Sequence, residues 1–107
     1  MAYRVLLVED AERDIEEIYA YIMRNDSIDR AEAVLDALEE VCVSLSDFPE
    51  RGNIPKELQE IGITVYREIH FKPYRIIYRI IGRDVVIHGV FDGRRDMESL
   101  LQRRMLR

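Results

Sequence analysis

The sequence has one cysteine, no long hydrophobic run and no signal-like beginning, and each absence argues against a class of protein. A single thiol, Cys42, cannot form an internal disulfide, which is unlike a disulfide-rich secreted domain. The longest apolar runs, such as residues 5–8, fall far short of the ~20 residues that a membrane-spanning helix needs. Glu9 and Asp10 follow too soon for a signal peptide. We therefore expect a cytoplasmic protein with no membrane segment.

Histidine and cysteine are also too sparse and too scattered for a metal centre. Cys42, His70 and His88 contain no pair at the spacing of zinc ligands, so we expect no metal and no cofactor. Cys42 lies in a helical apolar pattern, which favours a packing role. His88 falls in an apolar strand, which favours a hydrogen-bonded structural histidine over an acid–base role.

Charge is divided unevenly along a chain whose 107 residues fit one domain, residues 1–107. Residues 1–65 hold 6 Lys/Arg and 16 Asp/Glu, whereas residues 66–107 hold 10 Lys/Arg and 5 Asp/Glu. The division indicates an acidic scaffold and a basic working surface, suited to nucleic acid or to an acidic partner. The net charge of −5 argues against a protein that works by nonspecific phosphate binding.

The first half of the chain predicts a strand and two helices. Residues 3–8 are β-rich and apolar. Asp10 can cap a helix that ends near residues 25–26, and Ser27 can cap a second helix whose apolar stripe runs to Leu45. Two amphipathic helices with a tight polar link are typical of an αα-hairpin. Their apolar stripes need a sheet built from the rest of the chain.

The second half predicts a loop, three strands and a C-terminal helix or frayed tail. Residues 47–63 are broken by proline and glycine, with a short turn of helix at residues 55–60. Strands are expected at residues 65–71, 74–81 and 85–91, and their short links favour an antiparallel meander. Asp96 is a candidate N-cap for residues 94–107. The fold class is therefore α+β, with an N-terminal strand and an αα-hairpin packed on an antiparallel sheet.

Several ordered motifs resemble the RelE/ParE toxin superfamily. Residues 74–80 (YRIIYRI), 85–87 (VVI) and 93–96 (GRRD) resemble the C-terminal half of these toxins. Residues 11–15 match an Ala-x-x-Asp-hydrophobic helix opening, and residues 49–52 match Pro-x-x-Gly. The resemblance implies the toxin of a type II, or plasmid stabilisation, toxin–antitoxin system. It also implies a hetero-oligomer with a cognate antitoxin, whose disordered acidic and apolar segment folds on the toxin.

The two branches of this superfamily differ in function. RelE-like toxins cleave mRNA on the ribosome, whereas ParE-like toxins act on DNA gyrase. Of the RelE-like catalytic pattern, Arg75 and Arg95 match here, but the lysine positions hold Tyr66 and Glu68 and the tyrosine position holds Leu101. A carboxylate repels phosphate and leucine transfers no proton. The pattern favours a ParE-like gyrase inhibitor without enzymatic activity.

Two alternatives stay open at this point. One is an endoribonuclease that uses Arg75 and Arg95 with an unrecognised base. The other is a degenerate toxin that only binds its antitoxin.

Basic residues of the C-terminal half are the candidate contacts with a target or an antitoxin. Strand alternation places Arg75, Ile77 and Arg79 on one face, which we expect to be open to solvent or to a partner. Arg75 is alternatively a solvated arginine or one salt-bridged to Glu68. The candidate binding residues are Arg67, Arg75, Arg79, Arg94 and Arg95.

Overall fold

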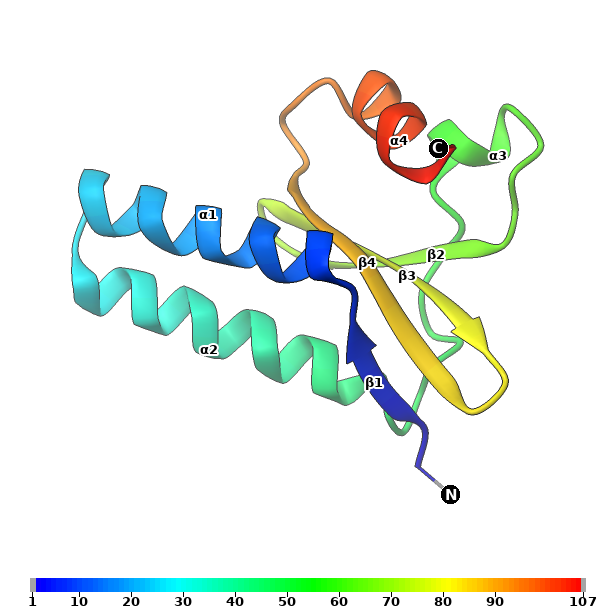
Figure 1. Cartoon of the computed structure of the whole chain (residues 1–107), viewed down its shortest axis with the longest axis horizontal. Coiled ribbons are helices and arrows are strands. Elements are labelled where there is room, and N and C mark those ends of the chain that lie inside the picture. Colours follow the sequence, from blue (N-terminus) through cyan, green and yellow to red (C-terminus); the bar gives the residue numbers. More distant parts are fainter. Residues whose placement is uncertain (1, 107) are drawn as a thin grey trace.

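The computed structural model describes residues 2–106 and contains four strands and four helices in that range. In chain order they are β1 (Arg4–Leu7), α1 (Glu9–Asn25), α2 (Ile28–Ser44), α3 (Lys56–Gln59), β2 (Tyr66–Phe71), β3 (Tyr74–Ile81), β4 (Asp84–Asp92) and α4 (Met97–Met105). The α1–α2 hairpin lies beside one face of the sheet, and α3 and α4 lie together beyond its other face (Figure 1). The α+β fold and the C-terminal helix are thus confirmed. No helix in this range is long and apolar enough to cross a membrane.

The two hairpin helices begin by different means. α2 begins as predicted, because the Ser27 Oγ accepts a hydrogen bond of 3.0 Å from the Arg30 backbone N–H. The prediction that Asp10 caps α1 is wrong. Val8 occupies the N-cap position and makes no side-chain cap bond, because its apolar side chain has no acceptor. The Val8 N–H donates to Ile87 O of β4, so the chain passes directly from the sheet into the helix. Asp10 lies in the first turn, where a carboxylate favours the helix dipole.

The sheet has the order β1-β4-β3-β2 and is mixed. The meander of β2, β3 and β4 is antiparallel as predicted, but β1 pairs with β4 in parallel, so the sheet is not wholly antiparallel. A bridge between Asn53 and Glu68 occupies the outer edge of β2, which leaves the edge of β4 for β1. Parallel entry lets β1 continue into α1, which packs on β4.

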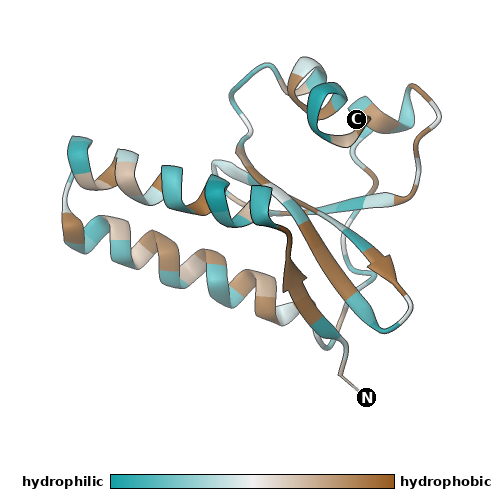
Figure 2. Cartoon of the chain, in the orientation of Figure 1, coloured by the Kyte–Doolittle hydropathy of each residue, from teal (hydrophilic) through white to brown (hydrophobic). Residues whose placement is uncertain are grey.

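Both faces of the sheet are covered, each by its own apolar cluster. The hairpin face buries Ile76 and Tyr78 of β3 against residues such as Leu38 of α2. The opposite face buries Ile77 and Phe91 against α3 and α4. The hydropathy colouring shows both helices of the hairpin with apolar sides along their length (Figure 2). The prediction that the face of Ile77 is open to solvent or a partner is therefore wrong, because the short C-terminal helices cover it.

Candidate functional site

Arg75 lies at the centre of a polar cluster on the sheet face that α3 and α4 cover. The cluster, named here the Arg75 cluster, consists of Arg75, Glu57, Glu68, His70 and Asn53. β2 and β3 bring three of these residues together, because Arg75 pairs directly with His70 in the antiparallel register and Glu68 is two residues before His70. Glu57 comes from α3. The cluster thus joins residues that are up to 22 positions apart in the sequence.

The guanidinium of Arg75 is held by two carboxylates. Its Nε donates to Glu68 Oε1 at 2.6 Å and its Nη2 to Glu68 Oε2 at 2.9 Å. Toward Glu57, Nη1 donates to Oε2 at 2.9 Å and Nη2 to Oε1 at 2.8 Å. The three side chains are only 15% (Arg75), 13% (Glu57) and 4% (Glu68) exposed. This is a buried, bidentate ion pair on both sides of one arginine.

The electrostatics of the cluster follow from these bonds. Hydrogen bonds from Arg75 hold the pKa of Glu57 below its ordinary value, and the bonds to Glu57 raise the pKa of Arg75. Asn53 Nδ2 donates to Glu68 Oε2 at 3.3 Å, and His70 Nε2 lies 3.0 Å from Glu68 Oε1. One guanidinium thus faces two carboxylates, and four of its five N–H groups donate to them.

The positions that the superfamily resemblance pairs with catalytic groups have other roles here. The ring of Tyr66 packs edge-on against His88, with 5.3 Å between ring centroids. Glu68 belongs to the Arg75 cluster. Leu101 is fully buried in the apolar cluster under α4. Tyr66 and Glu68 therefore supply no cation at the positions that the resemblance pairs with lysines, and Leu101 supplies no proton donor at the position paired with tyrosine.

The other candidate arginines fall into two groups. Arg67 donates from Nη1 to the backbone oxygens of Glu50 (3.2 Å) and Gly52 (2.8 Å), and so it supports the loop before α3. Arg94 pairs with Asp92 at the surface. Arg79 and Arg95 make no side-chain ion pair or hydrogen bond within residues 2–106. These last two keep their charge available to a partner.

Tyr78 explains the Pro-x-x-Gly motif at residues 49–52. Its buried hydroxyl donates to Pro49 O at 2.7 Å and accepts from the Gly52 N–H at 3.1 Å. A Cβ at Gly52 would stand 2.5 Å from both Glu68 O and the Tyr78 hydroxyl, so only glycine fits there. The sequence pattern predicts Tyr78 only as a strand residue. Its place in the Tyr-Arg repeat gave no sign of this role.

A second ion pair, which no motif in the sequence indicates, joins α4 to the hairpin. Arg104 donates to both carboxylate oxygens of Asp14 at 3.0 Å and to His88 O at 3.1 Å, and it lies over the ring of Phe91. Asp14 also accepts from the Val90 N–H. The Asp of the Ala-x-x-Asp motif thus ties together α1, β4 and α4.

His88 differs in one respect from the hydrogen-bonded histidine that its sequence context favours. Its buried Nε2 has no hydrogen-bond partner in the part of the chain that the structure describes. Burial, and the nearby charges of Arg79 and Arg104, lower the pKa of His88, so the ring is held neutral in the folded chain. It serves as a packing residue beneath Tyr66.

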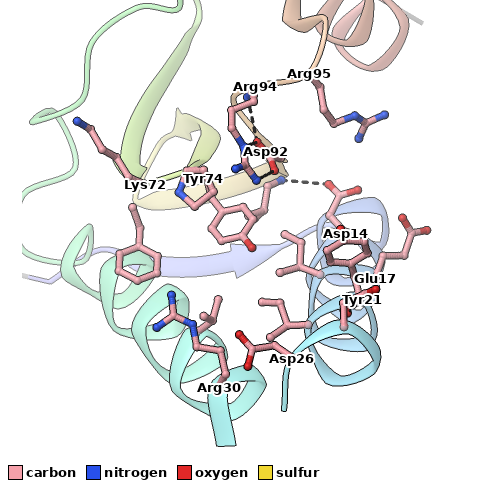
Figure 3. A pocket seen from close by; sticks show the side chains of 17 residues that line it. Asp14, Glu17, Tyr21, Asp26, Arg30, Lys72, Tyr74, Asp92, Arg94 and Arg95 are labelled. Atoms are coloured by element: carbon pink, nitrogen blue, oxygen red, sulfur yellow. Dashed lines mark hydrogen bonds and ion pairs between the residues drawn. The ribbon is translucent and has the colours of Figure 1, made fainter. Parts of the chain in front are cut away.

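A groove of ≈ 640 Å³ opens between the end of the α1–α2 hairpin and the β2–β3 turn. We name it the hairpin groove. Figure 3 shows Tyr74 at its centre, with Asp14, Glu17 and Tyr21 of α1 on one side and Lys72 on the other. Arg94 and Arg95 stand at the end that follows β4. The hairpin groove is separate from the Arg75 cluster, since no residue of that cluster lines it.

No group of three or more His, Cys, Asp or Glu side chains in the described range could hold a metal ion. The lone thiol, Cys42, is buried in the core under the hairpin, and burial raises its pKa to about 11. At neutral pH it is protonated and unreactive.

Comparison with known proteins gives concordant matches over almost the whole chain. A family model described as the ParE toxin of the type II toxin–antitoxin system parDE matches residues 5–97. The chain is 31% identical over 98 residues to Toxin ParE3 of Caulobacter vibrioides, and the match covers 92% of this chain and 94% of that toxin.

Solved structures share the fold at lower identity. The chromosomal ParDE system of P. aeruginosa matches with a TM-score of 0.72 and 14% identity, over 85% of this chain and 96% of that one. The RelBE2 toxin–antitoxin complex of Mycobacterium tuberculosis matches with a TM-score of 0.64 and 23% identity, over 86% and 92%.

Proposed function

The chain belongs to the ParE toxin family of type II toxin–antitoxin systems, and on that premise we propose that it inhibits DNA gyrase by direct protein–protein contact. In this proposal it acts in the cytoplasm as a binding protein rather than as an enzyme. A cognate antitoxin keeps it inactive by forming a hetero-oligomer with it.

The observation that carries the proposal is the neutralised guanidinium of the Arg75 cluster. Cleavage of RNA through its 2′-hydroxyl needs a base, cations that stabilise the charge on the reacting phosphate, and an acid for the leaving oxygen. Four hydrogen bonds from Arg75 go to Glu57 and Glu68 instead. The two carboxylates that hold Arg75 carry more negative charge than its guanidinium carries positive charge, and they disfavour the approach of a phosphate backbone. This favours gyrase over mRNA as the target.

Within the proposal, the candidate arginines differ in whether their guanidinium groups are free to contact gyrase. Arg79 and Arg95 have no intramolecular ion pair within residues 2–106, and they are the arginines that we expect to touch gyrase. Arg94 can join them by leaving Asp92, since an exposed ion pair contributes only about 0–1 kcal/mol. Arg67 and Arg75 are occupied within the chain and act by holding the surface in place.

The test is a DNA supercoiling assay with purified gyrase, run beside a translation extract probed for cut mRNA. The wild-type chain should block supercoiling and leave mRNA intact. An Arg79→Ala/Arg95→Ala variant should lose inhibition, whereas Arg24→Ala, an exposed arginine on α1, should retain it. Cut mRNA with normal supercoiling would establish the endoribonuclease alternative. A chain that does neither, yet binds its antitoxin, would be a degenerate toxin.

A further inference from the structure

We propose that one side of the α1–α2 hairpin is a docking site for a basic amphipathic helix of a partner protein other than the antitoxin. The site, named here the acidic groove, is formed by two adjoining hollows of ≈ 420 and ≈ 470 Å³. Ile15, Glu16 and Leu35 line both hollows, so the two form one continuous surface. No residue that lines the acidic groove also lines the hairpin groove. The inference goes beyond the proposed function and does not depend on it.

The floor of the acidic groove is apolar and is built by three elements. Val5 and Leu7 come from β1, Ile15 from α1, and Leu35 and Val43 from α2. The first four of these side chains are half-buried, and Val43 is 59% exposed. A contiguous apolar surface of this kind, open to solvent and bordered by polar residues, marks a site of protein interaction. The volume of each hollow lies within the range of specific binding pockets.

The rim of the acidic groove carries charges of one sign. Every charged residue that lines it, among those that the structure describes, is acidic: Glu12, Glu16, Glu32, Asp36 and Glu39. All five are exposed, and none has an ion pair or a side-chain hydrogen bond within residues 2–106. Glu12 and Glu16 are four positions apart on α1, and Glu32 and Asp36 are four apart on α2. Like charges at this spacing destabilise a helix, so a cationic partner would relieve a repulsion within the fold.

The sign of the rim determines which partner fits. Five carboxylates repel nucleic acid, and they equally repel the acidic segment expected of the antitoxin. A symmetric contact with a second copy of the chain would place one acidic groove against another. No group of three or more His, Cys, Asp or Glu side chains in residues 2–106 could hold a metal ion, so the acids do not form a cation site. A polypeptide with lysine or arginine beside an apolar stripe complements both the rim and the floor.

The shape of the groove favours a helix as the docked segment. α1 and α2 run side by side (Figure 1), and their acidic lining residues recur at helical spacing on each helix. A third helix can therefore lay its apolar stripe between α1 and α2, with basic residues on both flanks, as amphipathic helices do in other grooves. The sheet reaches the groove only through Val5 and Leu7 of β1, a strand of four residues. A strand added there would leave most of the groove uncovered.

The test reverses charge in two matched pairs. Glu16→Lys/Glu39→Lys changes the rim of the acidic groove. Glu40→Lys/Glu60→Lys makes the same change in net charge at exposed glutamates that line neither hollow. Lysine at position 16 follows Glu12 by four positions, an order that favours the helix, and lysine is as good a helix former as glutamate. The groove variant should therefore melt no lower than the wild type, and a loss of binding is separable from a loss of fold.

The probe is a synthetic peptide of leucine, alanine and lysine, with the 17-residue length of α1 and α2 and leucine at helical spacing. Two control peptides are used. One has the same composition with leucine and lysine alternating, and the other has glutamate in place of lysine. Binding is measured by titration calorimetry at low and at high salt. Amide signals of Ile15 and Leu35 should shift when the probe is added to the labelled chain.

The expected result is a preference for the basic helical peptide that depends on the rim. The wild-type chain should bind it about ten-fold more tightly than either control peptide. The groove variant should bind it about ten-fold more weakly than the wild type, with a smaller difference at high salt, because screening weakens the rim charges. The Glu40→Lys/Glu60→Lys control should retain the wild-type affinity.

Four outcomes overturn the inference and leave the family assignment and the gyrase proposal in place. The first is equal affinity of the wild type and the groove variant for the probe. The second is equal weakening in both double variants, which would show attraction by net charge alone. The third is a shift of the amide signals of Tyr74 and Val90 instead, which would place the probe in the hairpin groove. The fourth is a wild-type dimer, seen by sedimentation and lost in the groove variant, which would assign the acidic groove to a second copy.

Discussion

Replacing Arg75 by alanine should lower the free energy of unfolding of this protein, and the structure indicates the size of the decrease. The substitution leaves the carboxylates of Glu57 and Glu68, which are 13% and 4% exposed, without their shared cation. Removing one partner of a buried ion pair costs about 3–5 kcal/mol, because an uncompensated charge stays buried. A domain of this size has a total stability of about 5–15 kcal/mol, so the loss is a large fraction of it.

The assay is thermal and urea unfolding at pH 7, followed by circular dichroism. At about 4 °C per kcal/mol, Arg75→Ala should lower the Tm by about 12–20 °C. Arg94→Ala is the matched control, because the pair of Arg94 and Asp92 is largely exposed and contributes about 0–1 kcal/mol. The triple variant Arg75→Ala/Glu57→Gln/Glu68→Gln should recover at least half of this decrease in Tm, because it leaves no charged side chain of the cluster buried without a partner.

The effect should also depend on pH in a defined direction. The pKa of Glu57 is lowered in the fold by its bonds to Arg75, so the pair stabilises the chain above the ordinary value of 4.5. This contribution is lost as pH falls through the folded-state pKa. The difference in melting temperature between wild type and Arg75→Ala should therefore become smaller below about pH 4.5. If the two proteins melt within about 3 °C of each other at pH 7, the reasoning about a buried, uncompensated charge is refuted.

Two further predictions concern Tyr78 and His88. Tyr78→Phe removes the hydroxyl that bonds the loop at residues 49–52, and it should lower the free energy of unfolding by about 1–3 kcal/mol and speed hydrogen exchange at the Gly52 amide. Unchanged exchange at that amide would contradict the role given to the hydroxyl. Burial lowers the pKa of His88 below its ordinary value of 6.5. The free energy of unfolding should therefore decrease as pH falls below 6.5, because His88 of the unfolded chain takes up a proton before His88 of the folded chain does. His88→Phe should flatten that decline in a series of urea unfolding curves, and an unaltered slope would assign it to other groups.

Much of the architecture followed from local patterns. The apolar stripes at helical spacing predict α1 and α2, and Ser27 and Asp96 cap their helices as their positions predict. The alternating strands with short links predict the antiparallel meander. These features depend on neighbouring residues, whose spacing the sequence displays directly. The one local error concerned the start of α1, where a long-range bond from Val8 to β4 replaced the expected Asp10 cap.

The availability of the candidate arginines depends on partners far along the chain. Strand alternation identifies the face of Arg75 but does not show that Glu57 of α3 covers it, or that α4 closes the same face above Ile77. The sequence indicates Glu68 as one possible partner for Arg75, and the structure adds Glu57 as a second partner.

The sequence by itself determined the helices, the meander and the superfamily, because periodicity, caps and ordered motifs are local properties of the chain. Only the tertiary structure decided which charges are available. It buries Arg75 between two carboxylates, binds Arg104 to Asp14, and leaves Glu16 and Glu39 unpaired, within residues 2–106, beside an apolar floor. The physical reason is that the charge state and accessibility of a side chain are set by the groups that surround it. In this protein those groups come from segments that meet only when the sheet forms.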